Sequence, residues 1–445
     1  MGVTNVNMKR LLQGASALTL GMLVGSSTAQ AAGFQVNEQS AVNTGRASSV
    51  TATVKDPSAI WHNPAGLTQT EGTEFQVGIN LIRAAGQYEG NGIPSTNPNY
   101  PDTVTADVDY NLKLVPNIYA SRALSSKAYV GLGFYLPYGS GIKWQGAEDY
   151  VGRTVVQELD LRTFFITPAI ALKLSDMVSV AVGVSLVPAT AYLKRTLGAS
   201  DNGQVLFPKS KYSKEGTVEI AGSAFGVGAN AGVQVSLMEH LKLGLAFRSA
   251  IDLSFSGDAN FDIPSDAPSD VRANFPDGEG TLDVTLPHTF LFGVGWEHGP
   301  LTVEASTQVT MWNSYKELRL NFSSGLPTPS SASPRNWKVV PLFRLGAQYD
   351  LAELALRAGI GYDMSPVPDT TVDFTLPDND RIYFTLGAGY DLGFMRADVG
   401  YMGLFIAGRE LDQGENVNFP IGAQEPGSYN AGMAHVISLS LSTRI

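Results

Sequence analysis

Apolar and polar residues alternate along most of the chain from about residue 73 onward, a period of two that is typical of β-strands. In the clearest example, from Val178 to Leu186, large apolar residues alternate with Ser, Ala and Gly. The same alternation recurs at residues 241–248, 301–306 and 437–442. Roughly thirteen to fifteen such segments follow one another, against the seven or so strands of an immunoglobulin-like domain. The pattern predicts an all-β fold with a single antiparallel sheet closed on itself.

The lengths of the connections between these segments distinguish two possible folds, a membrane barrel and a soluble sandwich. In a sandwich the apolar face would form the core. Long, polar connections are expected at residues 86–106, 198–215, 257–280, 323–336 and 407–430. Others are short, such as Glu239-His240 and Gly299-Pro300. Long loops on one side and short turns on the other are typical of outer-membrane barrels, whose apolar strand faces contact lipid. We therefore predict a transmembrane antiparallel β-barrel.

One uncharged stretch, Ile220 to Met238, is long enough to span a bilayer as a helix. Its four glycines and its Ser, Asn and Gln side chains make it too polar for that. We expect a barrel strand there.

The composition agrees with a protein whose surface is not fully exposed to water. Only 16% of the 445 residues are charged, whereas soluble domains average about 25%. The absence of cysteine excludes disulfides and cysteine-ligated metals. A net charge of -11 argues against a nucleic-acid partner.

The N-terminal region reads as an export signal. Lys9 and Arg10 precede an apolar run from residue 11 to 24, and small residues at 29–31 suit a signal peptidase. We expect residues 1–31 to be a signal peptide, residues 32–72 a hatch and residues 73–445 the barrel. Apolar and polar residues do not alternate in the hatch segment. Its apolar residues, such as Trp61, favour a packed plug over a disordered leader. The expected location is the outer membrane of a Gram-negative bacterium.

The sequence contains no catalytic or metal-binding motif that we recognise. Its five histidines lack metal-site spacing, and no Gly-x-Ser-x-Gly elbow occurs. The Gly-x-Gly pairs at Gly131, Gly293 and Gly387 lack the third glycine of a dinucleotide site, so we interpret them as places of close packing or bending in the wall. We expect no enzyme activity, no catalytic residue, no cofactor and no metal. Small inward side chains favour hydrophobic solutes over ions or sugars.

Several segments, in the same order along the chain, resemble the FadL-type outer-membrane transporters of long-chain fatty acids and aromatic hydrocarbons. They are Ala32–Glu38, Gly45–Ala47, Trp61–Leu67, Gly131–Gly139, Ser365–Val367 and Leu376–Arg381. The resemblance implies fourteen strands, an N-terminal hatch inside the lumen, and a kinked third strand that opens a side exit toward lipid. In that mechanism the solute enters an outer groove, moves to a site by the hatch and leaves laterally, without an energy source.

The resemblance also implies the binding residues. Phe34 matches the ligand-contacting start of the hatch, and Arg195 and Lys338 match basic residues that meet a fatty-acid carboxylate; the alternative for both is an ordinary rim cation. Asn63, Pro64 and Ala65 match the hatch motif.

The resemblance places the kink of the third strand at Pro137, Gly139 and Gly141. A simple turn at the end of the strand is the alternative reading of these three residues.

We further expect a monomer, and the net charge already argues against a nucleic-acid partner. The expected partners are hydrophobic small molecules, outer-membrane lipid, lipopolysaccharide and the barrel-assembly machinery. The chain ends in Ile445 where family members end in phenylalanine.

Two alternatives to fatty-acid uptake stay open at this point. Monoaromatic hydrocarbons would need the same oily lumen but no cation. A surface adhesin or structural barrel would have a permanently closed plug.

Overall fold

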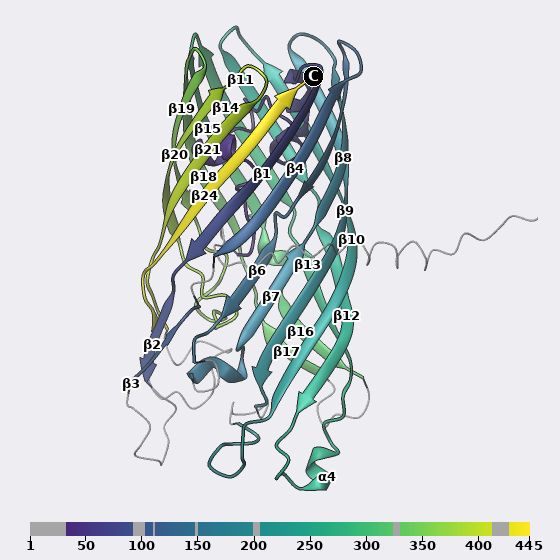
Figure 1. Cartoon of the computed structure of the whole chain (residues 1–445), viewed down its shortest axis with the longest axis vertical. Helices are drawn as coiled ribbons and strands as arrows, with labels where there is room; N and C mark the ends of the chain where they lie inside the picture. Colours follow the sequence, from purple (N-terminus) through teal and green to yellow (C-terminus); the bar gives the residue numbers. More distant parts are fainter. Residues whose placement is uncertain are drawn as a thin grey trace, which may run out of the picture.

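The structure, a computed structural model, describes residues 33–91, 103–109, 112–146, 150–198, 205–323, 330–411 and 427–445. The predicted signal peptide, residues 1–31, lies outside these residues. The described chain forms a tall barrel with the N-terminal segment inside it (Figure 1). Among the described residues, no helix has the length and apolar character needed to span a membrane.

Twenty strand segments form one closed antiparallel sheet and make fourteen crossings of the barrel wall among the described residues. Six crossings consist of two collinear segments. In order, the crossings are β1 (Thr73–Ala84), β4 (Lys113–Ala123), β5 (Ala128–Tyr135) with β6 (Gly139–Lys143), β7 (Glu158–Thr163) with β8 (Phe165–Lys173), β9 (Val178–Thr196), β10 (Thr217–Ser236), β11 (Leu241–Arg248) with β12 (Ile251–Asp262), β13 (Gly278–Leu286) with β14 (Thr289–His298), β15 (Leu301–Met311) with β16 (Glu317–Phe322), β17 (Ser330–Pro334) with β18 (Val339–Leu351), β19 (Leu354–Asp363), β20 (Arg381–Asp391), β21 (Arg396–Ile406) and β24 (Gly432–Arg444).

The first and last strands close the barrel, because β1 pairs with β24 from Glu74–Arg444 to Ala84–Ala434. Side chains alternate between the two faces as predicted. On β9, Val182 is 58% exposed on the outer face, whereas Ser185 is 5% exposed on the inner face. The uncharged stretch questioned above is β10, which pairs with β9 along its length. Apolar side chains outside and small polar ones inside confirm the predicted membrane barrel.

The short turns and the chain's C-terminus lie at one end of the barrel, and the long connections lie at the other (Figure 1). The connection predicted at 257–280 is shorter, because β12 continues to Asp262 and β13 begins at Gly278. Outward positions there include Asp258, Asn260 and Asp262, and the apolar residues of β12 point inward, which is the reverse of the pattern expected for a lipid-facing strand. The connection predicted at 86–106 contains part of a small sheet, which consists of β2 (Gln87–Asn91), β3 (Thr103–Asp107), β22 (Arg409–Glu410) and β23 (Ser428–Tyr429).

The hatch occupies the half of the barrel near the short turns (Figure 1). It contains α2 (Ala41–Gly45), α3 (Ala59–His62) and the 3-10 helix η1 (Pro64–Gln69). Ser40 caps α2 by accepting a hydrogen bond from the Asn43 amide. The remaining short helices belong to loops: η2 (Val151–Thr154), α4 (Ser269–Arg272) and η3 (Trp312–Ser314).

Glycines on the inner wall let the hatch approach the strands. A side chain at Gly244 would overlap the backbone of the hatch at Thr51 and Ala52. A side chain at Gly293 would overlap the side chains of Glu304 and Thr51. Gly387 touches Gly45 of α2, and Gly131 faces Ile60 and Leu67 of the hatch.

Ile60 and Leu67, both fully buried, anchor α3 and η1 against the wall. The predicted close packing at the three Gly-x-Gly positions is therefore packing of the barrel wall against the hatch.

We predict that Gly244→Ala displaces the hatch, because the added carbon would overlap backbone that cannot rotate away. The barrel itself should still close, so the heat-dependent shift in gel mobility should persist. Cells carrying the variant should become sensitive to vancomycin, which is too large for a plugged barrel. Gly280→Ala is the matched control, because its added carbon meets neighbours at 3.5 Å or more. Equal sensitivity of the two variants would contradict this packing role.

Candidate functional site: the hatch arm and three cavities

The third crossing of the wall is interrupted between β5 and β6. β5 ends at Tyr135, β6 begins at Gly139, and Pro137 lies in the interruption. Proline fixes its own backbone angle and has no amide hydrogen, so a regular ladder does not continue through it. The predicted kink residues Gly139 and Gly141 both belong to β6.

The start of the hatch, which we call the hatch arm (residues 33–39), pairs with the chain at this interruption. The Val36 amide donates to the Pro137 carbonyl at 2.7 Å, and the Gly139 amide donates to the Phe34 carbonyl at 2.9 Å. Gln35 and Tyr138 face each other as an isolated antiparallel bridge. The arm therefore acts as a short extra strand that satisfies backbone groups in the gap.

The neighbouring strand β4 borders the same gap. Its pairing with β5 ends at Ile118–Phe134, and among the described residues hydrogen bonding to the third crossing resumes only where the Asp109 amide donates to the Lys143 carbonyl. Pro116 lies in the intervening part of β4. Proline is found at sheet edges because it cannot donate to a ladder. Pro116 thus marks a local edge inside an otherwise closed barrel.

Phe34 lines an apolar cavity of about 600 Å³, which we call the aromatic cavity. Its ring lies 4.7 Å from Trp312, 5.9 Å from Tyr315 and 5.8 Å from Trp337, measured between ring centroids. Leucines and valines from β7, β13 and β16 line the rest of the cavity: Leu159, Leu161, Leu282, Val284 and Leu318. The predicted ligand contact Phe34 therefore lies where an oily molecule would fit.

The aromatic cavity has one cation among its described lining residues, Arg335, and that cation is already paired. Its Nη1 forms a salt bridge with Asp373, and both side chains are at most 3% exposed. The other Asp373 oxygen accepts from the Thr375 amide at 2.9 Å. A carboxylate entering this cavity would have to compete with Asp373.

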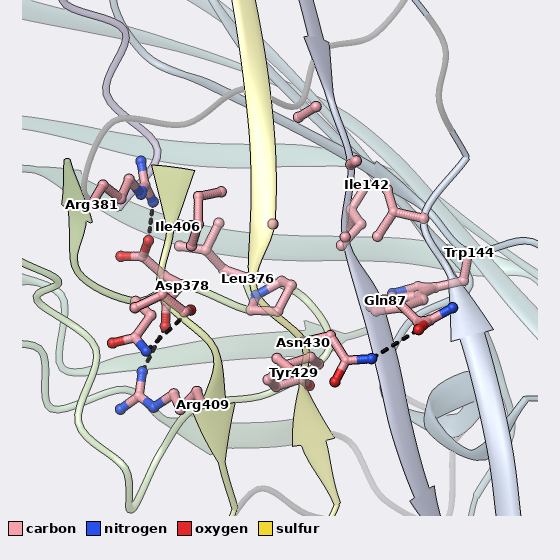
Figure 2. A pocket seen from close by; sticks show the side chains of 18 residues that line it. Gln87, Ile142, Trp144, Leu376, Asp378, Arg381, Ile406, Arg409, Tyr429 and Asn430 are labelled. Carbon is pink, nitrogen blue, oxygen red and sulfur yellow. Dashed lines mark hydrogen bonds and ion pairs between the residues drawn. The ribbon is translucent and has the colours of Figure 1, made fainter. Parts of the chain in front are cut away.

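A second cavity of about 730 Å³, the rim cavity, lies at the long-loop ends of β1, β21 and β24. Figure 2 shows Arg381 directed at Asp378 and Arg409 bonded to the Asp378 backbone. The Asp378 carboxylate also accepts the Gly33 amide of the hatch arm at 3.1 Å. Leu376 lines both this cavity and the aromatic cavity, so it lies between them.

A third cavity, of about 320 Å³, lies next to the wall interruption. Tyr135 and Tyr138, on either side of the gap, line it together with Trp61 of the hatch. Tyr138 also packs against Phe34, with ring centroids 6.3 Å apart. Phe34 and Tyr138 therefore stand between the aromatic cavity and the third cavity.

The structure does not bring the two predicted basic residues to Phe34. Arg195 is partly exposed near the end of β9, Lys338 is exposed, and neither lines any of the three cavities. Their role as carboxylate partners stays a prediction. Arg335 and Trp337, close to Lys338 in sequence, line the aromatic cavity instead. They lie in an irregular segment before β18, where no periodicity indicates which side chains point inward.

The hatch motif joins the hatch to the wall. The Asn63 side-chain amide donates to the Thr51 carbonyl at 2.8 Å and to the Val233 carbonyl of β10 at 3.0 Å. Its oxygen caps η1 by accepting from the Ala65 amide at 3.2 Å, and Pro64 starts that helix. Asn63 therefore stabilises the start of η1 and also bonds the hatch to the barrel wall.

One buried carboxylate of the wall also anchors the hatch. Glu304 on β15 is fully buried, and its two oxygens each lie 3.1 Å from the Ala52 amide. One oxygen also accepts from the Thr53 hydroxyl at 2.7 Å, and the same hydroxyl accepts from Arg46. Hydrogen bonds to a charged acceptor are stronger than neutral ones.

We predict that Glu304→Gln weakens docking of the hatch by about 1.5–3 kcal/mol, the range for a hydrogen bond to a charged group. In planar lipid bilayers the variant should show brief conductance openings far more often than the unaltered chain. Glu279→Gln, an exposed position on β13, is the control. A quiet Glu304→Gln barrel would contradict the anchoring role.

Comparison with known proteins agrees with this arrangement. Residues 22–444 match the family model "Outer membrane protein transport protein (OMPP1/FadL/TodX)". A long-chain fatty acid transport protein of Salmonella typhi is 25% identical over 392 residues, covering 84% of this chain and 87% of its own. A FadL homologue of Pseudomonas aeruginosa superposes with a TM-score of 0.79 at 20% identity, covering 93% and 99% of the two chains. The Ralstonia pickettii toluene transporter gives a TM-score of 0.67 at 16% identity, with 91% and 98% coverage.

Proposed function

The chain belongs to the outer membrane protein transport family that includes FadL and TodX, and we propose that it takes up hydrophobic compounds, foremost long-chain fatty acids, by passive diffusion. The similar Salmonella typhi protein is named for long-chain fatty acid transport. The barrel with its hatch is the conduit, and we assign it no catalytic step.

The route runs through the cavities in order. A solute enters the rim cavity, passes Leu376 into the aromatic cavity, and meets Phe34 of the hatch arm. Displacement of the arm from Pro137 and Gly139 opens the gap between β4 and the third crossing. The pairing of the arm with this gap is the observation that carries the proposal.

Lateral exit suits a greasy solute. Each methylene group that stays out of water saves about 0.8 kcal/mol, so a fatty chain gains from leaving directly into lipid. Leu112 and Leu132 are both more than half exposed on the outer face near the gap. They give the exit an apolar border.

Uptake of aromatic hydrocarbons is the second candidate, and the Arg335–Asp373 pair favours it. A cavity whose cation is already neutralised can take an uncharged ring without breaking an ion pair. Phe34, Trp312 and Trp337 supply edge contacts for such a ring. The aromatic cavity can hold an aromatic ring or the alkyl chain of a fatty acid, whereas the carboxylate of the acid needs a free cation.

The remaining partners are part of the same proposal. The apolar outer wall contacts outer-membrane lipid, with lipopolysaccharide at the long-loop end, and the barrel-assembly machinery inserts the chain. One chain closes the sheet by itself through β1 and β24, so transport needs only a monomer.

We predict that a disulfide between the hatch arm and the wall blocks uptake. Gln35 and Tyr138 form a non-hydrogen-bonded antiparallel pair, and Cα atoms in such pairs lie about 4.5 Å apart, within disulfide range. The chain has no cysteine of its own. The oxidised Gln35→Cys/Tyr138→Cys variant should take up labelled oleate no faster than cells without the barrel, and reduction should restore uptake.

The two single-cysteine variants, treated with the same oxidant, control for loss of the Tyr138 ring. Uptake by the oxidised double variant equal to that of its reduced form would refute arm displacement. No uptake by the unaltered chain would favour a structural or adhesive barrel.

A further inference from the structure

Arg248, at the end of β11, is a buried cation without a carboxylate partner in the described structure. It is 7% exposed and lines the third cavity. Its Nη1 donates to the Trp61 carbonyl at 2.6 Å, and the guanidinium lies 3.6 Å from the Trp61 ring centroid. Its Nε and Nη2 have no hydrogen-bond partner among the described residues.

The cations of the other two cavities differ from Arg248 in this respect. Arg335 pairs with Asp373, Arg381 with Asp378, and Arg409 with Asp369. The described groups that interact electrostatically with Arg248 include Tyr135, Tyr138, Arg344 and His62, with no carboxylate among them. Within the part of the chain that the structure describes, no acidic residue lines the third cavity.

A buried guanidinium with two unmet donors is unfavourable, because the hydration it loses is only partly replaced. The Trp61 carbonyl replaces one interaction, and the contact with the Trp61 ring adds about 0.5–2 kcal/mol. A structural cation would normally have a protein carboxylate here, as in the two other cavities. An arginine left with a free edge suits an incoming anion that can accept two parallel hydrogen bonds.

We propose that Arg248 binds the carboxylate of a fatty acid in transit, in the third cavity beside the wall interruption. The proposal rests on the uptake function proposed above and names the acid-binding residue within it. The aromatic rings of Tyr135, Tyr138 and Phe165 surround the first part of the alkyl chain. Because Trp61 and Tyr138 contact this cavity, the head group is held between the hatch and the gap.

Binding at Arg248 makes the route selective for acids over uncharged solutes at one step. The aromatic cavity accepts the oily part of any solute, whereas the third cavity distinguishes an acid from its alcohol by one charge. Neutral aromatics would pass the third cavity without this contact. The transporter can therefore carry both classes while holding only the acid at the exit.

The test compares two ligands that differ only in the head group, oleate and oleyl alcohol, by equilibrium binding to the full-length detergent-extracted protein. Arg248→Gln should weaken oleate binding about tenfold or more, since a hydrogen bond to a charged group contributes about 1.5–3 kcal/mol. Binding of oleyl alcohol should change less than about twofold on the same reasoning.

A second variant leaves Arg248 in place. Asn230 lies directly opposite Arg248 on β10, so Asn230→Asp supplies an internal carboxylate partner. It should weaken oleate binding and spare oleyl alcohol. Asn230→Ala is the matched control, because it removes the same hydrogen bond to the Ile60 carbonyl without adding charge.

Equal loss of both ligands, or unchanged oleate binding in both Arg248→Gln and Asn230→Asp, would overturn the assignment. Failure of the uptake proposal gives a different result: selective oleate binding in detergent persists, but cells show no uptake of either ligand. Loss of oleate binding in Arg195→Ala/Lys338→Ala, with Arg248→Gln unaffected, would move the carboxylate site to those residues.

Discussion

The structure depends on the rule that backbone groups inside a bilayer must be hydrogen-bonded by the protein itself. A closed sheet meets this rule along its paired strands, and the interruption of the third crossing leaves a local gap in that pairing. There the hatch arm supplies the missing partners, through Val36 and Phe34. The arm is therefore part of the hatch and also a short extra strand of the wall. Any solute that displaces it exposes a gap that only lipid or the solute itself can fill.

Charge inside the lumen is arranged in two ways. Most of the described buried arginines have an acidic partner, such as Arg357 of β19 with Asp398 of β21 at 2.9 Å, and these pairs join strands and loops of the barrel to one another. Glu304 and the small hydroxyl residues of the inner face, including Ser179 and Ser438, bond directly to the hatch. Arg248 lacks such a partner and faces a cavity. Its position at the third cavity is the reason that we propose a ligand-binding role for Arg248.

The sequence was sufficient to predict the barrel, its inner and outer faces, and a packed hatch, because alternation along the strands directly reports which side chains meet lipid. It also placed Glu304 and Ser306 on the polar face. It could not predict how far β12 and β13 extend, because there the outward positions are polar and the apolar residues point inward, the reverse of the lipid-facing pattern. Nor could it find Arg335 or the free edge of Arg248, since pairing between distant residues depends on the closed fold. Pro116 was the missed local signal, because a proline within a strand indicates an edge.

The central claim is that the hatch arm leaves the wall when a solute passes. Backbone amide hydrogen exchange at Val36 and Gly139, followed by NMR in lipid nanodiscs with and without saturating oleate, measures this directly. The account predicts that both amides are protected in the absence of oleate and lose protection together when it is added. Protection of both amides that is unchanged by oleate, while labelled oleate still crosses the barrel, would contradict it.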